Sequence, residues 1–379
     1  MFVMARTESI RVPAELLPSD GRFGSGPSLV RKEAVSSLAE ISQSYLGTSH
    51  RQGPVKGMVQ RLQEGMAALF QIPDNWEILL GNGGATLFWD AATFGLIREK
   101  SQHLVFGEFS SKFSQAALSA PHLSDPEILT SEFGSAPSPS PSNVDFYALT
   151  QNETSTGVTI PLIRPEGVTV EKAIVAVDAT SAAGGMPWNP EEVDCYYFSP
   201  QKSFASDGGL WIAACSPACI DRIEEISNTG RWVPAGLDLK IALENSRKNQ
   251  TYNTPALSTI YLTVHQVEWM NEQGGLEWAS GRCHESSTHL YKWAESHEYA
   301  EPFVSNKSLR SPVVVTIDID ERVSADTLVT ACRENGILDI GGYRKIGRNQ
   351  IRVATFPAIE PVDIKALTNS LDYLMESLL

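Results

Sequence analysis

IVAVD at residues 174–178 and CYYFSPQK at residues 195–202 are the segments that decide the fold of this chain. Both begin as almost wholly apolar runs, the pattern of strands that are covered on both faces in a parallel sheet. Each run leads to a residue with distinctive chemistry, Asp178 in the first and Lys202 in the second. Only one short excursion, Thr180 to Asp194, separates the runs. We therefore expect neighbouring strands that hold Asp178 and Lys202 at the sheet edge where α/β proteins bind ligands.

A lysine amine and a carboxylate at one sheet edge are the two protein groups that pyridoxal phosphate chemistry needs. The amine forms a Schiff base with the cofactor, and the carboxylate pairs with the pyridinium nitrogen, so the ring stays protonated and accepts electrons. The sequence thus predicts Lys202 and Asp178 as catalytic residues. Taken singly, each has an ordinary explanation, because strands of parallel sheets often end in Asp and a Lys in a turn is usually solvated.

Length and composition indicate two domains. A chain of 379 residues that is 42% apolar and 20% charged can bury one large core and a smaller second one. We expect an N-terminal arm over residues 1–20, a large cofactor-binding domain over residues 21–273 and a small C-terminal α+β domain over residues 274–379. The pair Gly274-Gly275 marks the second boundary.

Charge and cysteine usage exclude several classes of protein. A net charge of −15 argues against nucleic acid or an anionic membrane surface as the main partner. No apolar run approaches the roughly 20 residues that span a bilayer, and the N-terminus becomes polar too early for a secretory signal. The five cysteines show no C-x-x-C or Cys/His metal spacing. We expect a cytoplasmic protein with reduced thiols and no metal site.

Alternating strands and helices predict an α/β fold with a mostly parallel sheet. The helical spacing of apolar residues predicts helices over 30–44 and 54–70, and a third that follows the glycine turn at residues 81–86 and runs through residue 97. Apolar runs predict strands at 76–80, 103–106, 146–149 and 210–214 in addition to the two above. The C-terminal part is expected to form helix 276–295, strand 313–319, helix 325–335, a short strand at 337–338, strand 350–355 and helix 362–378.

Gly83-Gly84-Ala85-Thr86 connects a predicted strand to a predicted helix, which is the arrangement of an anion cradle. Consecutive backbone N–H groups and the helix dipole can hold a phosphate there, although many glycine turns serve only to reverse the chain. The turn lacks the Lys-Ser/Thr of a P-loop and the spacing of a dinucleotide site.

Five more side chains are candidates for contact with cofactor or substrate. Thr154 could reach a ring oxygen of the cofactor and Phe109 could stack on the ring, although a polar loop and a core aromatic are the ordinary explanations. Guanidinium groups bind carboxylate and phosphate in a forked geometry, so Arg51, Arg344 and Arg352 are candidate anchors for substrate anions. An unselected arginine is usually a surface charge.

A set of short motifs is spread over nearly the whole chain: Gly24-Ser25-Gly26-Pro27-Ser28, Gly47-Thr48-Ser49-His50-Arg51, Gly81-Asn82-Gly83-Gly84-Ala85-Thr86, Asn152-Glu153-Thr154, Val177-Asp178-Ala179-Thr180-Ser181, Ser199-Pro200-Gln201-Lys202, Asn249-Gln250-Thr251-Tyr252-Asn253-Thr254-Pro255 and Gly342-Tyr343-Arg344-Lys345. With these motifs the chain resembles the phosphoserine aminotransferases, which are fold-type I, class V pyridoxal phosphate enzymes, and in particular their actinobacterial branch. Other class V enzymes share the Asp and the Lys but not the whole set.

The resemblance implies a role for each matching residue at the cofactor. Lys202 would hold the cofactor and then move the proton, Asp178 would pair with the pyridine nitrogen, and Thr154 would bond the ring hydroxyl oxygen. The contacts to the cofactor phosphate would come from Gly84, Ala85 and Gln201 and, from the partner subunit, Asn253 and Thr254. A homodimer with shared sites is therefore implied.

The resemblance also implies the substrate contacts and the reaction. Arg51, helped by His50 and Arg344, would bind the glutamate side chain or the substrate phosphate, and Arg352 would bind the α-carboxylate. The implied reaction converts L-glutamate and 3-phosphooxypyruvate to 2-oxoglutarate and O-phospho-L-serine in serine biosynthesis, with the four-carbon phosphorylated step of pyridoxine biosynthesis as a second activity.

Two positions depart from the family pattern, and other functions stay open. Phe109 stands where many members have a stacking Trp, and Tyr343-Arg344 stands where others have His-Arg. The alternatives are another class V activity, such as alanine–glyoxylate transamination or cysteine desulfuration, and a catalytically silent scaffold with this fold. A desulfurase needs a cysteine in a mobile Gly/Ser-rich loop, a setting that Cys283 and Cys332 lack.

Overall fold

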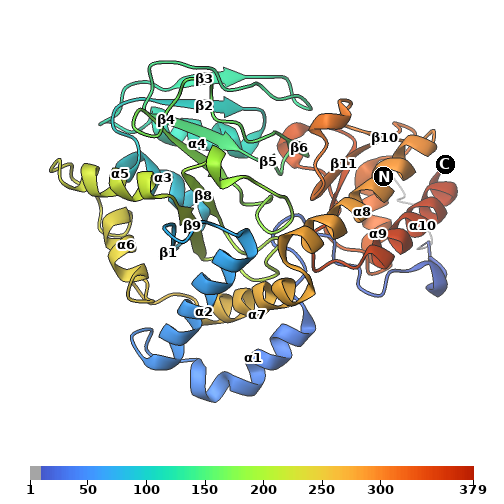
Figure 1. Cartoon of the computed structure of the whole chain (residues 1–379). Helices are drawn as coiled ribbons and strands as arrows, with labels where there is room; N and C mark the ends of the chain where they lie inside the picture. The colour runs from blue at the N-terminus through green and yellow to red at the C-terminus, as the bar shows by residue number, and fades with distance from the viewer. Residues whose placement is uncertain (1–9) are drawn as a thin grey trace, which may run out of the picture.

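A computed structural model describes residues 10–379 of the chain. Its centre is a seven-stranded sheet with the order β1-β9-β8-β7-β4-β2-β3 (Figure 1). The strands are β1 (Glu77–Asn82), β2 (Ser101–Val105), β3 (Glu127–Thr130), β4 (Phe146–Thr150), β7 (Ile174–Asp178), β8 (Cys195–Phe198) and β9 (Leu210–Cys215). All neighbouring pairs are parallel except the two that β9 forms with β8 and β1. The expected mostly parallel sheet is confirmed, with β9 as its antiparallel member.

Helices cover both faces of this sheet. On one face lie α2 (Gly53–Phe70) and α7 (Leu257–Gln273), with α1 (Lys32–Tyr45) packed outside them. On the other lie α3 (Ala85–Gly95), α4 (Glu108–Leu118), α5 (Pro217–Ser227) and α6 (Leu239–Ser246). Side chains of β7 alternate between the two cores, since Val175 and Val177 belong to one and Ile174 and Ala176 to the other. Burial on both faces explains why the strand is apolar at every position.

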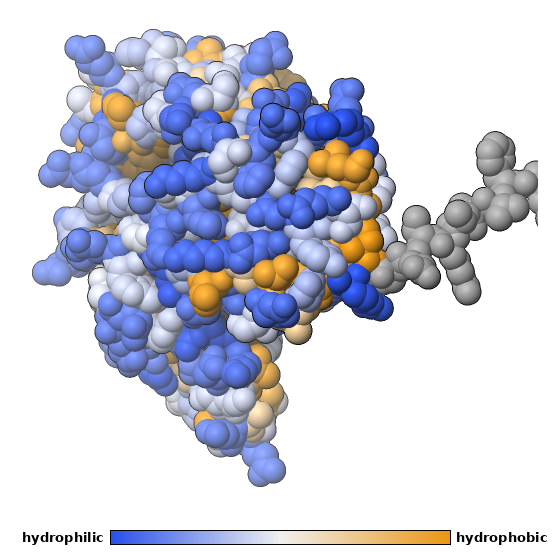
Figure 2. Space-filling model, turned by 90° about the vertical axis from the view of Figure 1, so that its right-hand side faces the viewer, coloured by the Kyte–Doolittle hydropathy of each residue, from blue (hydrophilic) through white to orange (hydrophobic). Residues whose placement is uncertain are grey.

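A second, smaller sheet lies in the C-terminal part of the chain. Its strands are β10 (Ala300–Pro302), β11 (Val314–Ile319) and β12 (Gln350–Ala354), all antiparallel. The helices α8 (Gly275–Ser296), α9 (Ala325–Glu334) and α10 (Pro361–Leu378) accompany it at one end of the molecule (Figure 1). Seen from that end, the surface is mostly hydrophilic with small separate hydrophobic patches (Figure 2). The domain boundary at residue 273 stays a prediction.

The short strand expected at residues 337–338 is not present, and this prediction was wrong. Leu338 forms only a single parallel bridge, to Arg22. The Leu338 N–H donates to the carbonyl of Gly21 at 2.7 Å, so the N-terminal segment satisfies the backbone that we expected to pair in a sheet. The described part of the arm is otherwise irregular apart from a 3₁₀ turn, Ala14–Leu16.

The arm and the two-stranded ribbon complete the fold. Ser19 donates from its backbone N–H and its hydroxyl to the Asp363 carboxylate in α10, both at 2.7 Å. The ribbon of β5 (Asn152–Glu153) and β6 (Val158–Thr159) follows β4. Among residues 10–379, no helix combines the length and apolar character needed to cross a membrane.

Glu153 connects the ribbon to the start of α4, which carries Phe109. Its fully buried carboxylate accepts hydrogen bonds from the backbone N–H and hydroxyl of Ser110, both at 2.9 Å, and from the hydroxyl of Ser155 at 2.7 Å. A carboxylate at a helix N-terminus also interacts favourably with the helix dipole. Glu153 therefore holds the beginning of α4 in place.

We expect Glu153→Ala to lower the free energy of unfolding by about 3 kcal/mol, because several buried donors would lose a charged acceptor. Urea denaturation of the purified protein measures the change. Glu40→Ala, at an exposed position in α1, is the matched control and should alter stability by less than about 0.5 kcal/mol. Equal effects of the two substitutions would show that Glu153 has no such role.

Candidate active site

A cavity of about 320 Å³ lies at the carboxyl ends of β7 and β8. Most of the predicted cofactor residues line this cavity, namely Gly84, Ala85, Phe109, Thr154, Asp178, Gln201 and Lys202. Asp178 is opposite Tyr197 in the pairing of β7 with β8, so the neighbouring strand ends expected from the sequence are present. The sheet edge thus brings together residues that are far apart in the sequence.

Lys202 is buried with its amine in a hydrogen-bonded chain. Its Nζ donates to the hydroxyl of Thr154 at 2.8 Å, and that hydroxyl donates to Ser181 Oγ at 2.9 Å. Burial, helped by the positive charge of Arg352, lowers the pKa of Lys202 to about 7. At neutral pH a substantial fraction of Lys202 is therefore the neutral amine, the form that is nucleophilic and can accept a proton.

Asp178 is buried beside donors that stabilise its ionised form. Trp89 Nε1 donates to one carboxylate oxygen at 3.0 Å, and the backbone N–H of Thr180 donates to the other at 2.9 Å. Burial raises the pKa of Asp178, and these two hydrogen bonds act in the opposite direction. The carboxylate can thus pair with a protonated ring nitrogen in the same cavity.

The glycine turn between β1 and α3 forms one wall of the cavity. Gly83 has φ +101°, a conformation that glycine adopts without strain. Gly84 is the N-cap of α3 and supplies no side-chain cap, so the N–H groups of the first turn are open to an anion. Across the cavity, Gln201 Oε1 is buried and has no hydrogen-bond partner among the described residues. The turn fits a phosphate group.

These features fit pyridoxal phosphate. The cavity combines a desolvated amine, a buried carboxylate and an uncapped helix N-terminus, which match the aldehyde, the ring nitrogen and the phosphate of that cofactor. Thr154, which would bond the ring hydroxyl, lies in hydrogen-bond contact with Lys202. No other cofactor is needed to explain the set.

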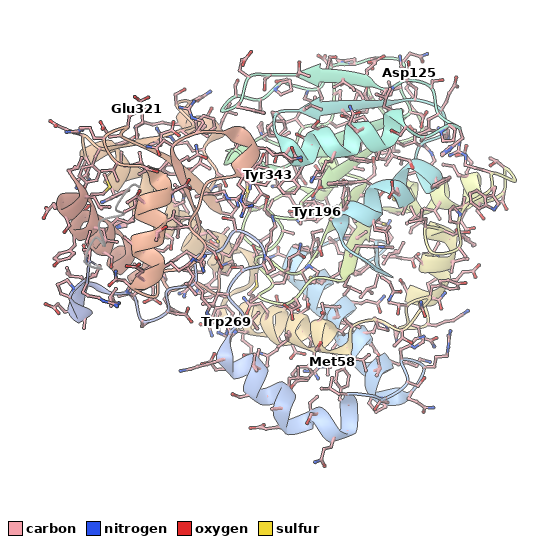
Figure 3. The ribbon with its side chains drawn as sticks, turned by 180° about the vertical axis from the view of Figure 1, so that it is seen from behind. Met58, Asp125, Tyr196, Trp269, Glu321 and Tyr343 are labelled. Atoms are coloured by element: carbon pink, nitrogen blue, oxygen red, sulfur yellow. The ribbon has the colours of Figure 1, made fainter. Side chains whose placement is uncertain are left out.

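Phe109 and two residues of the C-terminal part meet beside Lys202. The ring centre of Phe109 lies 5.5 Å from Lys202 Nζ and 5.8 Å from the ring centre of Tyr343. Arg352 on β12 lies 5.4 Å from the Tyr343 ring centre and donates to the backbone carbonyl of Thr154 at 2.9 Å. Figure 3 shows Tyr343 where the C-terminal elements approach α4.

The remaining predicted residues do not line this cavity. Thr254 and His50 are in contact, with Oγ1 and Nδ1 3.2 Å apart, and Arg51 donates to Gln250 at 2.8 Å. Asn253 lines a separate hollow of about 230 Å³ next to β1. Arg344 is exposed on a 3₁₀ turn, Arg344–Ile346. In one copy of the chain, His50, Arg51, Asn253 and Thr254 thus form a second group.

Several residues of the cavity were not singled out as site residues from the sequence. Gly26 and Pro27 cover Lys202, and a Cβ at Gly26 would lie 2.9 Å from Lys202 Cε. Gly26 belongs to the first motif of the resemblance, which was the available signal. Trp89 has no such signal, because an apolar position of α3 is equally consistent with a core residue.

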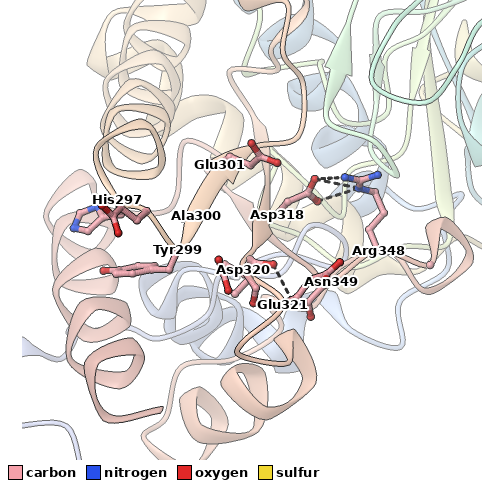
Figure 4. Close-up of a pocket in the computed structure, with 12 residues that line it drawn as sticks. His297, Tyr299, Ala300, Glu301, Asp318, Asp320, Glu321, Arg348 and Asn349 are labelled. Atoms are coloured by element: carbon pink, nitrogen blue, oxygen red, sulfur yellow. Dashed lines mark hydrogen bonds and ion pairs between the residues drawn. The ribbon is translucent and has the colours of Figure 1, made fainter. Parts of the chain in front are cut away.

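A different hollow, of about 660 Å³, lies at one end of the small C-terminal sheet, where β10 begins, β11 ends and the chain leads into β12 (Figure 4). Acidic side chains dominate its walls, including Glu298, Glu301 and Asp320. Its one arginine, Arg348, is paired with Asp318, with Nε and Oδ2 3.1 Å apart. An anionic cofactor would be repelled there, so this hollow does not compete with the cavity at Lys202.

The lowered pKa of Lys202 predicts unusual reactivity. In protein prepared without cofactor, acylation of Lys202 should rise through a midpoint near pH 7, because the neutral amine reacts and burial destabilises its charged form. Lys345 should react only at much higher pH, since Glu108 raises its pKa. Peptide mass spectrometry across a pH series measures both.

Arg352→Met provides the control for this measurement. Removal of the nearby positive charge should move the Lys202 midpoint to higher pH. A wild-type midpoint equal to that of an ordinary lysine would contradict the description of the site.

Comparison with known proteins identifies the family. Residues 135–344 match the class-V aminotransferase family model. The chain is 54% identical to a phosphoserine aminotransferase of Rhodococcus jostii, covering 97% of this chain and 98% of the relative. It is 51% identical to one of a Nocardioides species, covering 98% and 100%.

A solved structure supports the fold. The phosphoserine aminotransferase of Cytophaga hutchinsonii has a TM-score of 0.84 at 22% identity and covers 93% of this chain and 99% of its own. At this identity the likeness shows the fold alone, which is the expected fold-type I. Together with the family match and the close relatives, it confirms the resemblance found in the sequence: the chain belongs to the class-V aminotransferases, which depend on pyridoxal phosphate, and among them to the phosphoserine aminotransferase family.

Proposed function

We propose that the protein transfers the amino group of L-glutamate to 3-phosphooxypyruvate, producing 2-oxoglutarate and O-phospho-L-serine for serine biosynthesis in the cytoplasm. The observation that carries the proposal is the position of Arg352 next to Lys202. Its positive charge helps to lower the pKa of Lys202, and it donates to the carbonyl of Thr154, while Lys202 and Thr154 line the same cavity as Asp178. The names of relatives that are 51–54% identical over nearly the full chain support the substrates.

Different residues of the cavity would contact the phosphate, the ring face and the ring nitrogen of the cofactor. The first turn of α3 at Gly84 and Ala85, with Gln201, would hold the phosphate, and Phe109 would cover the ring face. When bound, pyridoxal phosphate would supply the carbonyl that takes up the amino group and a ring that accepts electrons from the α-carbon. Asp178 would keep a proton on the ring nitrogen by offering a buried, hydrogen-bonded carboxylate.

Lys202 would remove the proton from the α-carbon of the amino-acid substrate. With a pKa of about 7, its Nζ can accept a proton at neutral pH and release it again in the reverse direction. The hydroxyl of Thr154 accepts a hydrogen bond from this amine, which fixes where the amine points in the cavity. A general acid–base residue that is held in position contributes about 10²–10⁴-fold to rate.

Arg352 would bind the α-carboxylate of each amino-acid and oxo-acid substrate. The NH1 group of Arg352 donates to the Thr154 carbonyl. The Nε of Arg352 is buried and has no hydrogen-bond partner among the described residues. A half-buried guanidinium whose buried Nε has no partner is favoured to bind an anion. The carboxylate would then lie next to Lys202, where the α-proton is removed.

A second copy of the chain would supply the distal contacts. Asn253, Thr254, His50 and Arg51 form a group that does not line the cavity of their own chain. His50 Nε2 is buried and has no hydrogen-bond partner within residues 10–379. Burial and the charge of Arg51 lower the pKa of His50. In a homodimer, Asn253 and Thr254 would reach the cofactor phosphate of the partner, and Arg51, His50 and Arg344 would hold the substrate phosphate or the glutamate side chain.

The alternative functions have less support. The four-carbon phosphorylated oxo-acid of pyridoxine biosynthesis carries the same charges and is a second candidate substrate. A cysteine desulfurase needs an accessible thiol, whereas all five cysteines are buried. A silent scaffold would have no reason to keep a buried lysine and a buried aspartate in one cavity with a half-buried arginine next to them, since charged groups are costly to desolvate.

The catalytic role of Lys202 has a direct test. Lys202→Ala should lower kcat with L-glutamate and 3-phosphooxypyruvate by about 10³-fold or more, because the proton-transfer group is lost. Formation of 2-oxoglutarate measures turnover, and the near-visible absorption of the holoenzyme after addition of L-glutamate measures the first half of the reaction. Lys172→Ala, at an exposed position, is the control and should leave both unchanged.

Full turnover of Lys202→Ala would refute the mechanism. Turnover of the wild-type protein with L-alanine and glyoxylate, but not with L-glutamate and 3-phosphooxypyruvate, would refute the substrates while leaving the family unchanged.

Mixed dimers test the shared site. Chains with Lys202→Ala and chains with both Asn253→Ala and Thr254→Ala should each be poorly active alone. After co-refolding, random pairing should restore about a quarter of wild-type activity, because half of the dimers contain one intact composite site. Thermal unfolding of each variant verifies folding. If mixing restores no activity although heterodimers form, each chain builds its site alone.

A further inference from the structure

Three of the five cysteines meet in the interior, outside the cavity that Lys202 lines. Cys195 begins β8, Cys215 ends β9, and Cys219 lies in the first turn of α5. Their sulfur atoms all lie within 4.8 Å of one another. All three side chains are buried, with at most 2% of their surface exposed. The sequence showed no metal-type spacing, and only the pairing of the strands reveals this thiol cluster.

Strand pairing and a helix cap fix the positions of the three cysteines. The thiol cluster lies at the end of β8 that is opposite the cofactor cavity. Cys195 and Cys215 are directly opposite each other in the antiparallel pairing of β8 and β9. Ser216 caps α5 by accepting a hydrogen bond from the Cys219 N–H at 3.2 Å. Since β8 runs from Cys195 toward Lys202, the thiol cluster and the cofactor cavity lie at opposite ends of the same strand.

The surroundings of the thiol cluster offer three sulfur ligands and no fourth ligand. Cys195, Cys215 and Cys219 are the complete group of potential metal ligands found there among residues 10–379. The nearby Asp194 is already used, because its Oδ2 accepts from Arg164 at 2.7 Å and from the Val175 N–H at 2.8 Å. Structural zinc sites need four ligands, so the thiol cluster does not suit zinc.

The net charge of the complex distinguishes the other ions that bind thiolates. Three thiolates around a monovalent ion such as Cu⁺ would leave two negative charges in the protein interior, which is strongly unfavourable without paired cations. Three thiolates on a trivalent centre give a neutral group that can be buried without this penalty. A trivalent, thiophilic metalloid is therefore the ligand that matches both the number of sulfurs and the burial.

We propose that Cys195, Cys215 and Cys219 form a binding site for trivalent arsenic, taken up as arsenous acid. In this exchange each of three As–O bonds breaks and an As–S bond forms, and each thiol proton leaves with a hydroxide as water. Arsenic stays trivalent and no electrons are transferred. Arsenous acid is small and uncharged near neutral pH, so it enters through local opening of the fold more readily than an ion does. The site is independent of the proposed transamination.

The test uses the full-length holoenzyme, reduced with a phosphine and titrated with sodium arsenite. Native mass spectrometry should show one arsenic atom per chain, with the loss of three hydrogens. X-ray absorption at the arsenic edge should show three sulfur neighbours. No arsenic uptake, or an arsenic atom with fewer than three sulfurs, would overturn the proposal.

Variants identify the ligands. Cys195→Ala, Cys215→Ala and Cys219→Ala should each weaken arsenic binding by more than about tenfold, as the loss of one covalent ligand requires. Cys283→Ala and Cys332→Ala are matched controls, because both cysteines are buried but lie outside the thiol cluster. Unchanged binding in Cys219→Ala, or lost binding in either control, would place the arsenic elsewhere. Zinc chloride that blocks arsenite uptake would refute the argument from the number of ligands.

Discussion

Burial of β7 and β8 on both faces is the constraint on which the rest of the structure depends. Helices on each side exclude water from the side chains of these strands. Polar groups therefore lie at the strand ends, where they find hydrogen-bond partners or face a cavity. Asp178 and Lys202 lie at that edge. Their unusual electrostatics follow from the same burial, which raises the pKa of the aspartate and lowers that of the lysine.

The candidate active site also has residues from outside the large sheet next to it. Arg352 comes from the small C-terminal sheet, yet its charge is the second cause of the low Lys202 pKa and its NH1 binds the Thr154 carbonyl. Tyr343 packs edge-on to Phe109 and beneath the Arg352 guanidinium. The relative position of the two sheets therefore tunes the amine. In the proposed dimer, the group around His50 and Thr254 would complete the site from the other side.

Sequence reasoning was most successful where one pattern determines both structure and chemistry. The apolar strands, the glycine turn and the residues Gly84, Ala85, Thr154, Gln201 and Lys202 were predicted, and the structure brings them to one cavity. Sequence reasoning failed where the local structure or the role of a residue depends on contact with a segment that is distant in the sequence. Leu338 pairs with the N-terminal arm instead of forming a strand, and Trp89 is a hydrogen-bond donor to Asp178 although its sequence position resembles that of any core aromatic. The thiol cluster is a third example, since its members are 20 and 4 residues apart.

The sequence by itself determined the strand–helix alternation, the two anchor residues at strand ends and, through its motifs, the family of the enzyme. These properties follow from local periodicity and from residue types at fixed spacings. Both can be read from the sequence without knowledge of the tertiary contacts. Only the tertiary structure decided the antiparallel direction of β9, the donor that holds Asp178, the loop at Gly26 that covers Lys202 and the meeting of three thiols. Each of these depends on which segments become neighbours when the two cores form, and that outcome is set by packing of the whole chain rather than by any one segment.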